Sequence, residues 1–122
     1  MKKDLEERTK KFALTIIEFV CTLPRTREAD VLGKQLLRSS TSIGANYREA
    51  NRGVSRADFA NKIGTVQKEA AETQYWLELI LESSIRKPAN GPQLHQEATE
   101  LMAIFTSIGK KLKEQVIPSS TS

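Results

Sequence analysis

Two glutamates, Glu69 and Glu72, stand three residues apart and could act together as a carboxylate pair. Such a pair on one helix can ligate a metal with a neighbouring helix, as in di-iron bundles. Those sites also need Glu-x-x-His motifs, which the chain lacks, because its single histidine is His95. We therefore interpret Glu69 and Glu72 as structural polar residues, with Lys62 and Lys68 as ion partners, and expect no metal site.

Other catalytic signatures are also missing from the sequence. It contains no glycine-rich phosphate loop, no Gly-x-Ser-x-Gly elbow and no Cys-x-x-Cys pair. The one cysteine, Cys21, cannot close an internal disulfide, and we interpret it as a small core residue. We expect a protein that is not an enzyme, with no catalytic residue and no cofactor. A buried Glu69/Glu72 pair that binds a metal would instead favour an enzyme.

The composition indicates one soluble domain. The chain has 122 residues, of which 39% are hydrophobic and 28% are charged, which suits a single core. No apolar run approaches the length that crosses a bilayer, and the first residues lack the apolar stretch of a secretory signal. We expect a cytoplasmic protein that has no membrane partner.

Hydrophobic residues spaced alternately three and four apart predict four amphipathic helices, because this spacing places them on one helix face. No stretch shows the sustained alternation of a strand. The four expected core faces are Leu5, Thr9, Phe12, Ile16 and Phe19; Ala29, Leu32, Leu36, Ser40, Ile43, Tyr47, Ala50 and Val54; Phe59, Ile63, Val66, Ala70, Thr73, Leu77 and Ile80; and Leu94, Ala98, Leu101, Phe105, Ile108 and Leu112.

The predicted connections are short, at about residues 23–26, 53–55 and 86–91. Short connections make successive helices antiparallel neighbours. The sequence therefore predicts an all-α fold, an up-down-up-down antiparallel four-helix bundle over residues 1–116. Residues 117–122 are expected to form a flexible C-terminal tail.

Small and polar residues on the second expected helix point to a close contact. Gly33, Leu37, Ser40 and Gly44 fall on one line, where another backbone could approach. That contact is either within the chain or between subunits, and in the second case Leu37 and Gly44 belong to an oligomer interface. Asn46 is interpreted as a partly buried polar residue that fixes helix register.

The net charge of +4 is modest, so its distribution matters more than its size. An antiparallel path brings many lysines and arginines to the end of the bundle where the first and third helices begin. Such a pole could contact a phosphate backbone, or it could be an ordinary solvated surface. Our candidates for nucleic-acid binding are Arg48, Arg52, Arg56 and Lys62 at this pole, together with Lys34 and Arg38 on an outward stripe of the second helix.

The run from Tyr75 to Leu81 is apolar almost all around the third expected helix. Trp76 and Leu79 lie off its core face and either cover the end of the bundle or contact another subunit. We favour a subunit contact, because exposed apolar patches commonly mark interfaces.

The runs 36–50 and 68–73 carry a family resemblance. The first contains the pattern Ser-Ile-x-Ala-Asn-x-x-Glu, which begins at Ser42, and the second contains Glu-x-x-Glu-Thr, which begins at Glu69. Over about residues 8–115 the chain resembles the four-helix bundle proteins encoded by intervening sequences in bacterial 23S ribosomal RNA genes. It is also similar to the accessory variability determinant of diversity-generating retroelements.

This resemblance implies a homopentamer of parallel bundles around a central channel. It also implies a basic surface that engages nucleic acid or a reverse transcriptase, and no established catalysis. Taken with the residues, it predicts a non-enzymatic oligomeric bundle that binds RNA or DNA through a basic surface. The alternative is a protein-interaction scaffold or accessory subunit that does not itself bind nucleic acid.

Overall fold

The computed structural model describes the backbone of residues 2–121 and the side chains of residues 2–115. Its helices are α1 (Lys2–Cys21), α2 (Arg27–Asn51), α3 (Arg56–Glu82) and α4 (Gly91–Thr121). The helical backbone of α4 thus continues beyond the expected domain boundary at residue 116. The predicted flexible tail, 117–122, lies outside the described side chains and stays a prediction.

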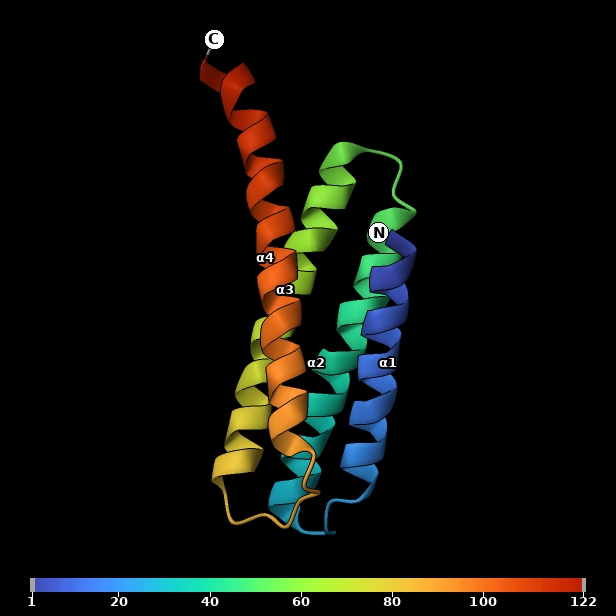
Figure 1. Ribbon diagram of the computed structural model, residues 1–122, viewed down its shortest axis with the longest axis vertical. Coiled ribbons are helices and arrows are strands. Elements are labelled where there is room, and N and C mark those ends of the chain that lie inside the picture. Colours follow the sequence, from blue (N-terminus) through green and yellow to red (C-terminus); the bar gives the residue numbers. More distant parts are fainter. Residues whose placement is uncertain (1, 122) are drawn as a thin grey trace.

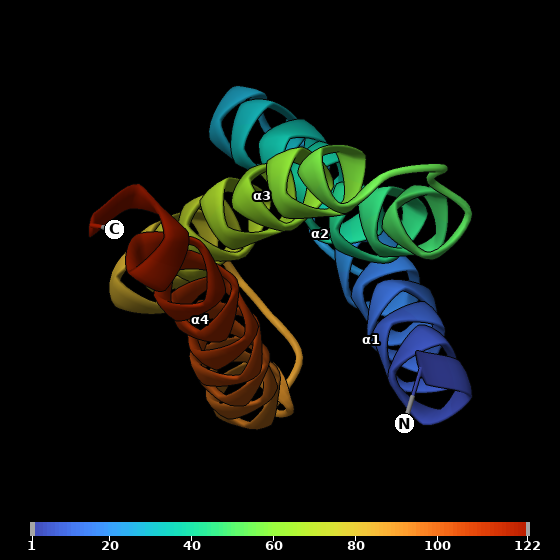
Figure 2. The same ribbon diagram turned by 90° about the horizontal axis from the view of Figure 1, so that it is seen from above.

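The four helices run alternately down and up the long axis (Figure 1). Helix α1 packs on α2, α2 on α3 and α3 on α4, whereas α1 and α4 form the least extensive of the four contacts between neighbouring helices. Seen from above, α1 and α4 diverge on one side of the bundle (Figure 2). The predicted all-α antiparallel bundle is confirmed.

Side chains mark the beginnings of two helices. Thr26 accepts a hydrogen bond from the backbone N–H of Ala29 at the start of α2, 3.2 Å away. Ser55 accepts one from the N–H of Asp58 at the start of α3, 3.1 Å away. Both satisfy a backbone donor that the first helical turn leaves free. At the other end of α3, Ser83 is the C-cap, so this helix ends about one turn earlier than the expected connection at 86–91.

The core follows the predicted faces closely. Of those residues, Leu5, Leu32, Phe59, Ile108 and Leu112 are only half-buried. Val54 was wrongly assigned to the core, because it is 96% exposed in the connection after α2 ends. The buried hydrophobic residues are Phe12, Ile16, Phe19, Ala29, Leu36, Ile43, Tyr47, Ala50, Ile63, Val66, Ala70, Leu77, Ile80, Leu94, Ala98, Leu101 and Phe105.

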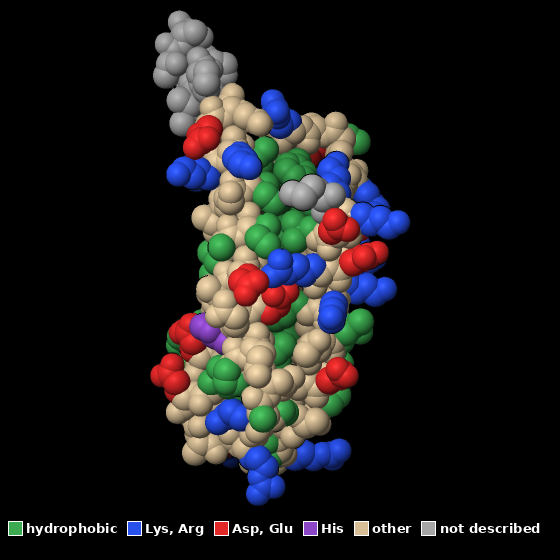
Figure 3. Space-filling view, in the orientation of Figure 1, with side chains coloured by type: hydrophobic (Ala, Val, Ile, Leu, Met, Phe, Trp, Pro, Cys, Tyr) green, Lys and Arg blue, Asp and Glu red, His purple; other side chains and the backbone are tan. Residues whose placement is uncertain are grey.

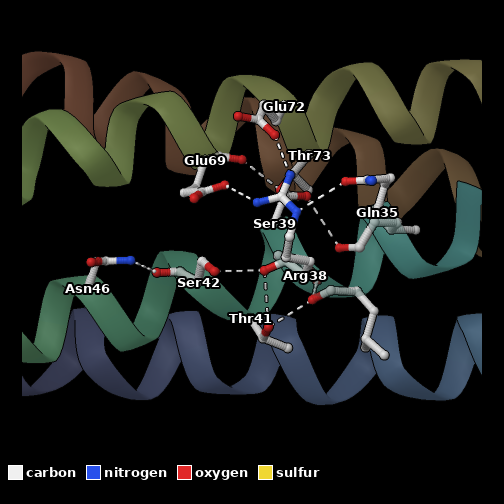
Figure 4. Close-up of polar contacts among 12 residues, drawn as sticks. Gln35, Arg38, Ser39, Thr41, Ser42, Asn46, Glu69, Glu72 and Thr73 are labelled. Carbon is white, nitrogen blue, oxygen red and sulfur yellow. Dashed lines mark hydrogen bonds and ion pairs between the residues drawn. The ribbon is translucent and has the colours of Figure 1, made fainter.

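The polar run in the middle of α2 remains helical despite its low helix propensity. Its hydroxyls bond backward within the helix: Thr41 donates to the Leu37 carbonyl at 2.8 Å, and Ser42 to the Arg38 carbonyl at 2.7 Å (Figure 4). A Cβ added at Gly44 would lie 3.1 Å from Thr9 Oγ1 of α1. The small residue therefore permits a close approach of α1 to α2.

Candidate nucleic-acid interface

Four helix ends meet at one pole of the bundle: the beginnings of α1 and α3 and the ends of α2 and α4 (Figure 1). Asn51 near the end of α2 donates from Nδ2 to Glu6 Oε2 of α1, 2.8 Å away. Arg56 at the start of α3 donates to Gln115 Oε1 of α4, 2.7 Å away. These two bonds place α1 beside α2 and α3 beside α4 at this pole, as the antiparallel path requires.

The short connection between α2 and α3 separates Arg52 from Arg56 by only three residues. The N–H of Gly53 bonds the Ala50 carbonyl at 3.2 Å, and the Ser55 cap then begins α3. A Cβ at Gly53 would lie 3.3 Å from that carbonyl oxygen and from Asp58 Cβ. The sequence therefore turns the chain within a few residues and leaves both arginines exposed.

The pole is partly neutralised by carboxylates of the same chain. Arg48 Nε lies 3.6 Å from Glu6 Oε1, and Lys62 Nζ lies 3.3 Å from Glu49 Oε1. The side chains of Arg48 and Lys62 are 47% and 41% exposed, so these are surface ion pairs of small net energy. Both cations remain accessible to solvent, but the paired carboxylates make the positive potential near them weaker than it would be near an unpaired arginine or lysine.

Arg52 and Arg56 donate to neutral acceptors. Arg52 Nη1 bonds the Arg48 carbonyl at 3.1 Å, and Arg56 Nη2 bonds the side-chain oxygen of Gln115. Neither guanidinium forms an ion pair within the part of the chain that the structure describes. Exposed lysines near the start of α1 and toward the end of α4 add positive charge at this pole: Lys2, Lys3, Lys110, Lys111 and Lys113. Lys10 and Lys11 lie further along α1. Figure 3 shows lysine and arginine side chains at the upper end of one face.

Lys34 and Arg38 do not join this pole. They lie toward the start of α2, so about 20 Å or more of helix separates them from Arg52 at 1.5 Å per residue. Arg38 instead donates to Glu72 and to Glu69 Oε1 of α3, the latter at 3.1 Å (Figure 4). The bond to Glu72 is the main cause of the raised pKa of Arg38. The six predicted binding residues are therefore not one cluster.

The two predicted structural glutamates thus share an arginine as their ion partner. Lys62, expected to pair with them, pairs with Glu49. The predicted polar residue Asn46 is half-buried and donates from Nδ2 to the Ser42 carbonyl, 2.9 Å away within α2. This bond lies inside one helix and does not itself set the register between helices.

Sequence reasoning missed the ion pairs of Arg8. Arg8 of α1 donates to both oxygens of Glu97 at 2.7 Å, and to Glu100 Oε1 at 2.8 Å, on α4. These contacts, chiefly the bond to Glu97, raise the pKa of Arg8. Arg8 is therefore engaged between helices. No local pattern signals it, because Arg8 and Glu97 are 89 residues apart.

The predicted interface residues have mixed surroundings. Trp76 and Leu37 are partly buried and pack against the core, and Leu79 is half-buried. The Nε1 atom of Trp76 is buried without a hydrogen-bond partner among the described residues. Gly44 faces Thr9 of α1, so its close contact here is within the chain. A subunit contact through these four residues stays a prediction.

The structure also bears on the cysteine, on metal binding and on membrane helices. Cys21, interpreted as a core residue, is exposed at the end of α1, so that interpretation was wrong. Among the described residues, no group of three His, Cys, Asp or Glu side chains could hold a metal ion. None of the described helices combines the length and the hydropathy that a membrane crossing needs.

Comparison with known proteins decides the family. The model of the 23S rRNA-intervening sequence protein family matches residues 2–107. The chain belongs to this family. No curated protein matches it.

A solved structure to which this chain is similar has the same fold. It is a crystal structure from Bacteroides thetaiotaomicron, described as a protein with unknown function from the S23 ribosomal protein family. The two chains are 39% identical, the match covers 90% of this chain and 99% of the other, and the TM-score is 0.80. Family membership and the four-helix fold are thus established together.

Proposed function

We propose that this protein is a non-enzymatic bundle that assembles into a homo-oligomer and binds RNA or DNA at the basic pole. The binding residues are Arg52 and Arg56, with Arg48 and Lys62 at the edges. Lys34 and Arg38 make a secondary contribution at most, since they lie far along α2 and Glu69 and Glu72 already engage Arg38.

One observation carries this proposal: Arg52 and Arg56, four residues apart around the α2–α3 connection, are both exposed and, among the described residues, donate to neutral groups only. A guanidinium presents several N–H donors in a fork that fits a phosphate, and its charge persists at any physiological pH. Lysines around the pole extend the positive field. Binding there would release counterions from the nucleic acid, which gives affinity without base recognition.

The oligomeric part of the proposal rests on Trp76, Leu79 and Leu37. These large apolar side chains are incompletely covered by their own chain, and Tyr75 beside them is 53% exposed. Burial of such a surface between copies stabilises an assembly. The family resemblance favours a pentamer, and a cytoplasmic location suits a chain whose one cysteine is exposed.

The test measures binding of a mixed-sequence RNA and DNA pool by fluorescence anisotropy at several salt concentrations. The double variant Arg52→Glu/Arg56→Glu should bind at least about tenfold more weakly, and the slope of log affinity against log salt should fall by about two. The matched control Arg25→Glu/Arg86→Glu reverses two exposed arginines in the connections at the opposite end. It should retain affinity. Equal effects of both variants would contradict binding at this pole, and no binding at low salt would support the scaffold alternative instead.

A further inference from the structure

A groove separates α1 from α4 near the basic pole. It encloses about 580 Å³. Its walls carry Leu5 of α1 and Ile104 and Ile108 of α4, all half-buried, and Tyr47 of α2 contributes from below. Figure 3 shows hydrophobic side chains in this hollow between the two helices. Because α1 and α4 form the least extensive of the four contacts between neighbouring helices, their facing apolar side chains are left incompletely covered.

Charged residues border this apolar surface. Lys2 on α1 and Lys111 on α4 line opposite walls and are exposed, and Asp4 lies on the α1 wall. Arg8 bounds the groove further along, where it crosses to Glu97 and Glu100. Since Arg8 is already paired with carboxylates, Lys2 and Lys111 are the cations available to a bound partner.

The shape and the charges define what fits. The α4 wall runs from Ala103 to Lys111, about 12 Å at 1.5 Å per residue, or slightly more than two helical turns. An amphipathic helix docks in such a groove by anchors spaced three and four residues apart. Lysines on both walls would meet acidic residues on either side of the apolar stripe, and would repel basic ones.

We propose that the α1/α4 groove binds an amphipathic helix of a partner protein, one whose apolar stripe is flanked by acidic residues. This surface contains none of Arg48, Arg52, Arg56 and Lys62, although Lys2 and Lys111 also contribute to the positive charge of the basic pole. The partner helix would cover Leu5, Ile104 and Ile108 and would pair with Lys2 and Lys111. It would lie beside both α1 and α4, where the ring of helix contacts is weakest.

The test uses two labelled synthetic peptides of about 20 residues, each with leucines on one helical face. One carries glutamates beside the leucines and the other carries lysines. Anisotropy should show binding of the glutamate peptide alone. Ser107 lines the groove and Thr106 does not, although both are exposed on α4. Ser107→Phe should weaken binding at least about tenfold by filling the groove, and Thr106→Phe should leave it unchanged.

A second matched pair tests the charges. Lys2→Glu/Lys111→Glu should weaken binding of the glutamate peptide at least about tenfold. Lys3→Glu/Lys110→Glu makes the same change in net charge at exposed positions outside the groove lining and should change binding less than twofold. Absence of glutamate-peptide binding, or equal effects within either pair, would overturn the proposal. A fall in the mass of the protein alone on Ser107→Phe would also overturn it, since a second copy would then be the occupant.

Discussion

The hydroxyl of Thr73 on α3 lies 2.9 Å from the hydroxyl of Ser39 on α2, and both side chains are completely buried (Figure 4). Ser39 in turn donates to the Leu36 carbonyl at 3.3 Å, so Thr73 is the donor between the two. The Glu69 carbonyl, 2.8 Å from Thr73 Oγ1, is a second acceptor within reach. A polar link therefore crosses the core between α2 and α3 without leaving a hydroxyl unsatisfied.

Loss of this link should destabilise the bundle. Thr73→Val keeps the side-chain shape but removes the donor, and we expect about 1–2 kcal/mol less free energy of unfolding in urea. Ser39→Ala should cost less, because Thr73 can still donate to the Glu69 carbonyl. The double variant should lose less than the sum of the singles. As a control, Thr65→Val removes a hydroxyl bonded only within α3 and should change stability by less than about 0.5 kcal/mol.

Arg8 is expected to stabilise the pairing of α1 with α4. Arg8→Met should lower the free energy of unfolding by about 1 kcal/mol, because the guanidinium bonds two carboxylates. The loss should be no larger, since the Arg8 side chain is 36% exposed and solvent screens its charge. Lys10→Met, at an exposed position of the same helix, should have little effect. Hydrogen exchange should also speed up in α1 of the Arg8 variant. Equal stability of the two variants would show that this bridge contributes nothing.

The carboxylate of Glu100 should make stability depend on pH. Bonds from Gln96 and then Arg8 hold the pKa of Glu100 below its ordinary value. A lowered folded-state pKa stabilises the protein above the ordinary carboxyl pKa, and this contribution disappears as pH falls through the folded-state pKa. Glu100→Gln should therefore be less stable than the wild type at neutral pH, and the difference should shrink and then vanish as pH falls through the folded-state pKa of Glu100. A difference that persists in acid would contradict this.

Two glycines should respond to substitution with opposite signs. A Cβ at Gly64 would meet nothing within 4 Å, so Gly64→Ala should stabilise α3 by about 1 kcal/mol. Gly44 faces the buried side chain of Thr9 at close range. A larger side chain there must push α1 away, and Gly44→Leu should cost about 1–3 kcal/mol. Thermal unfolding of both variants gives the two signs directly.

The fold could be predicted from the sequence because each helix buries one regular face. Phe12, Ile16 and Phe19 recur at helical spacing, and the structure buries all three. The cap that begins α3 also has a local sequence signal, because Ser55 stands three residues before Asp58. Val54 follows the same spacing but lies beyond the end of α2 and is exposed. Helical spacing predicts burial only for residues that are in the helix.

The details of the candidate site could be predicted only in part. The antiparallel path correctly brought the start of α1 to the end of α2, where Glu6 now contacts Asn51. Partners across helices could not be deduced, because they depend on rotation and axial register that spacing does not fix. Arg38 therefore proved to pair with Glu69 and Glu72, and Arg8 with Glu97.

The proposed function requires an assembly that binds nucleic acid at its basic pole. Light scattering coupled to size-exclusion chromatography, with and without a mixed RNA and DNA pool at low salt, measures both parts at once. We expect a mass several times the 13.7 kDa of one chain, and a larger complex with the pool that dissociates at high salt. A mass of one chain that the pool does not change would contradict the account.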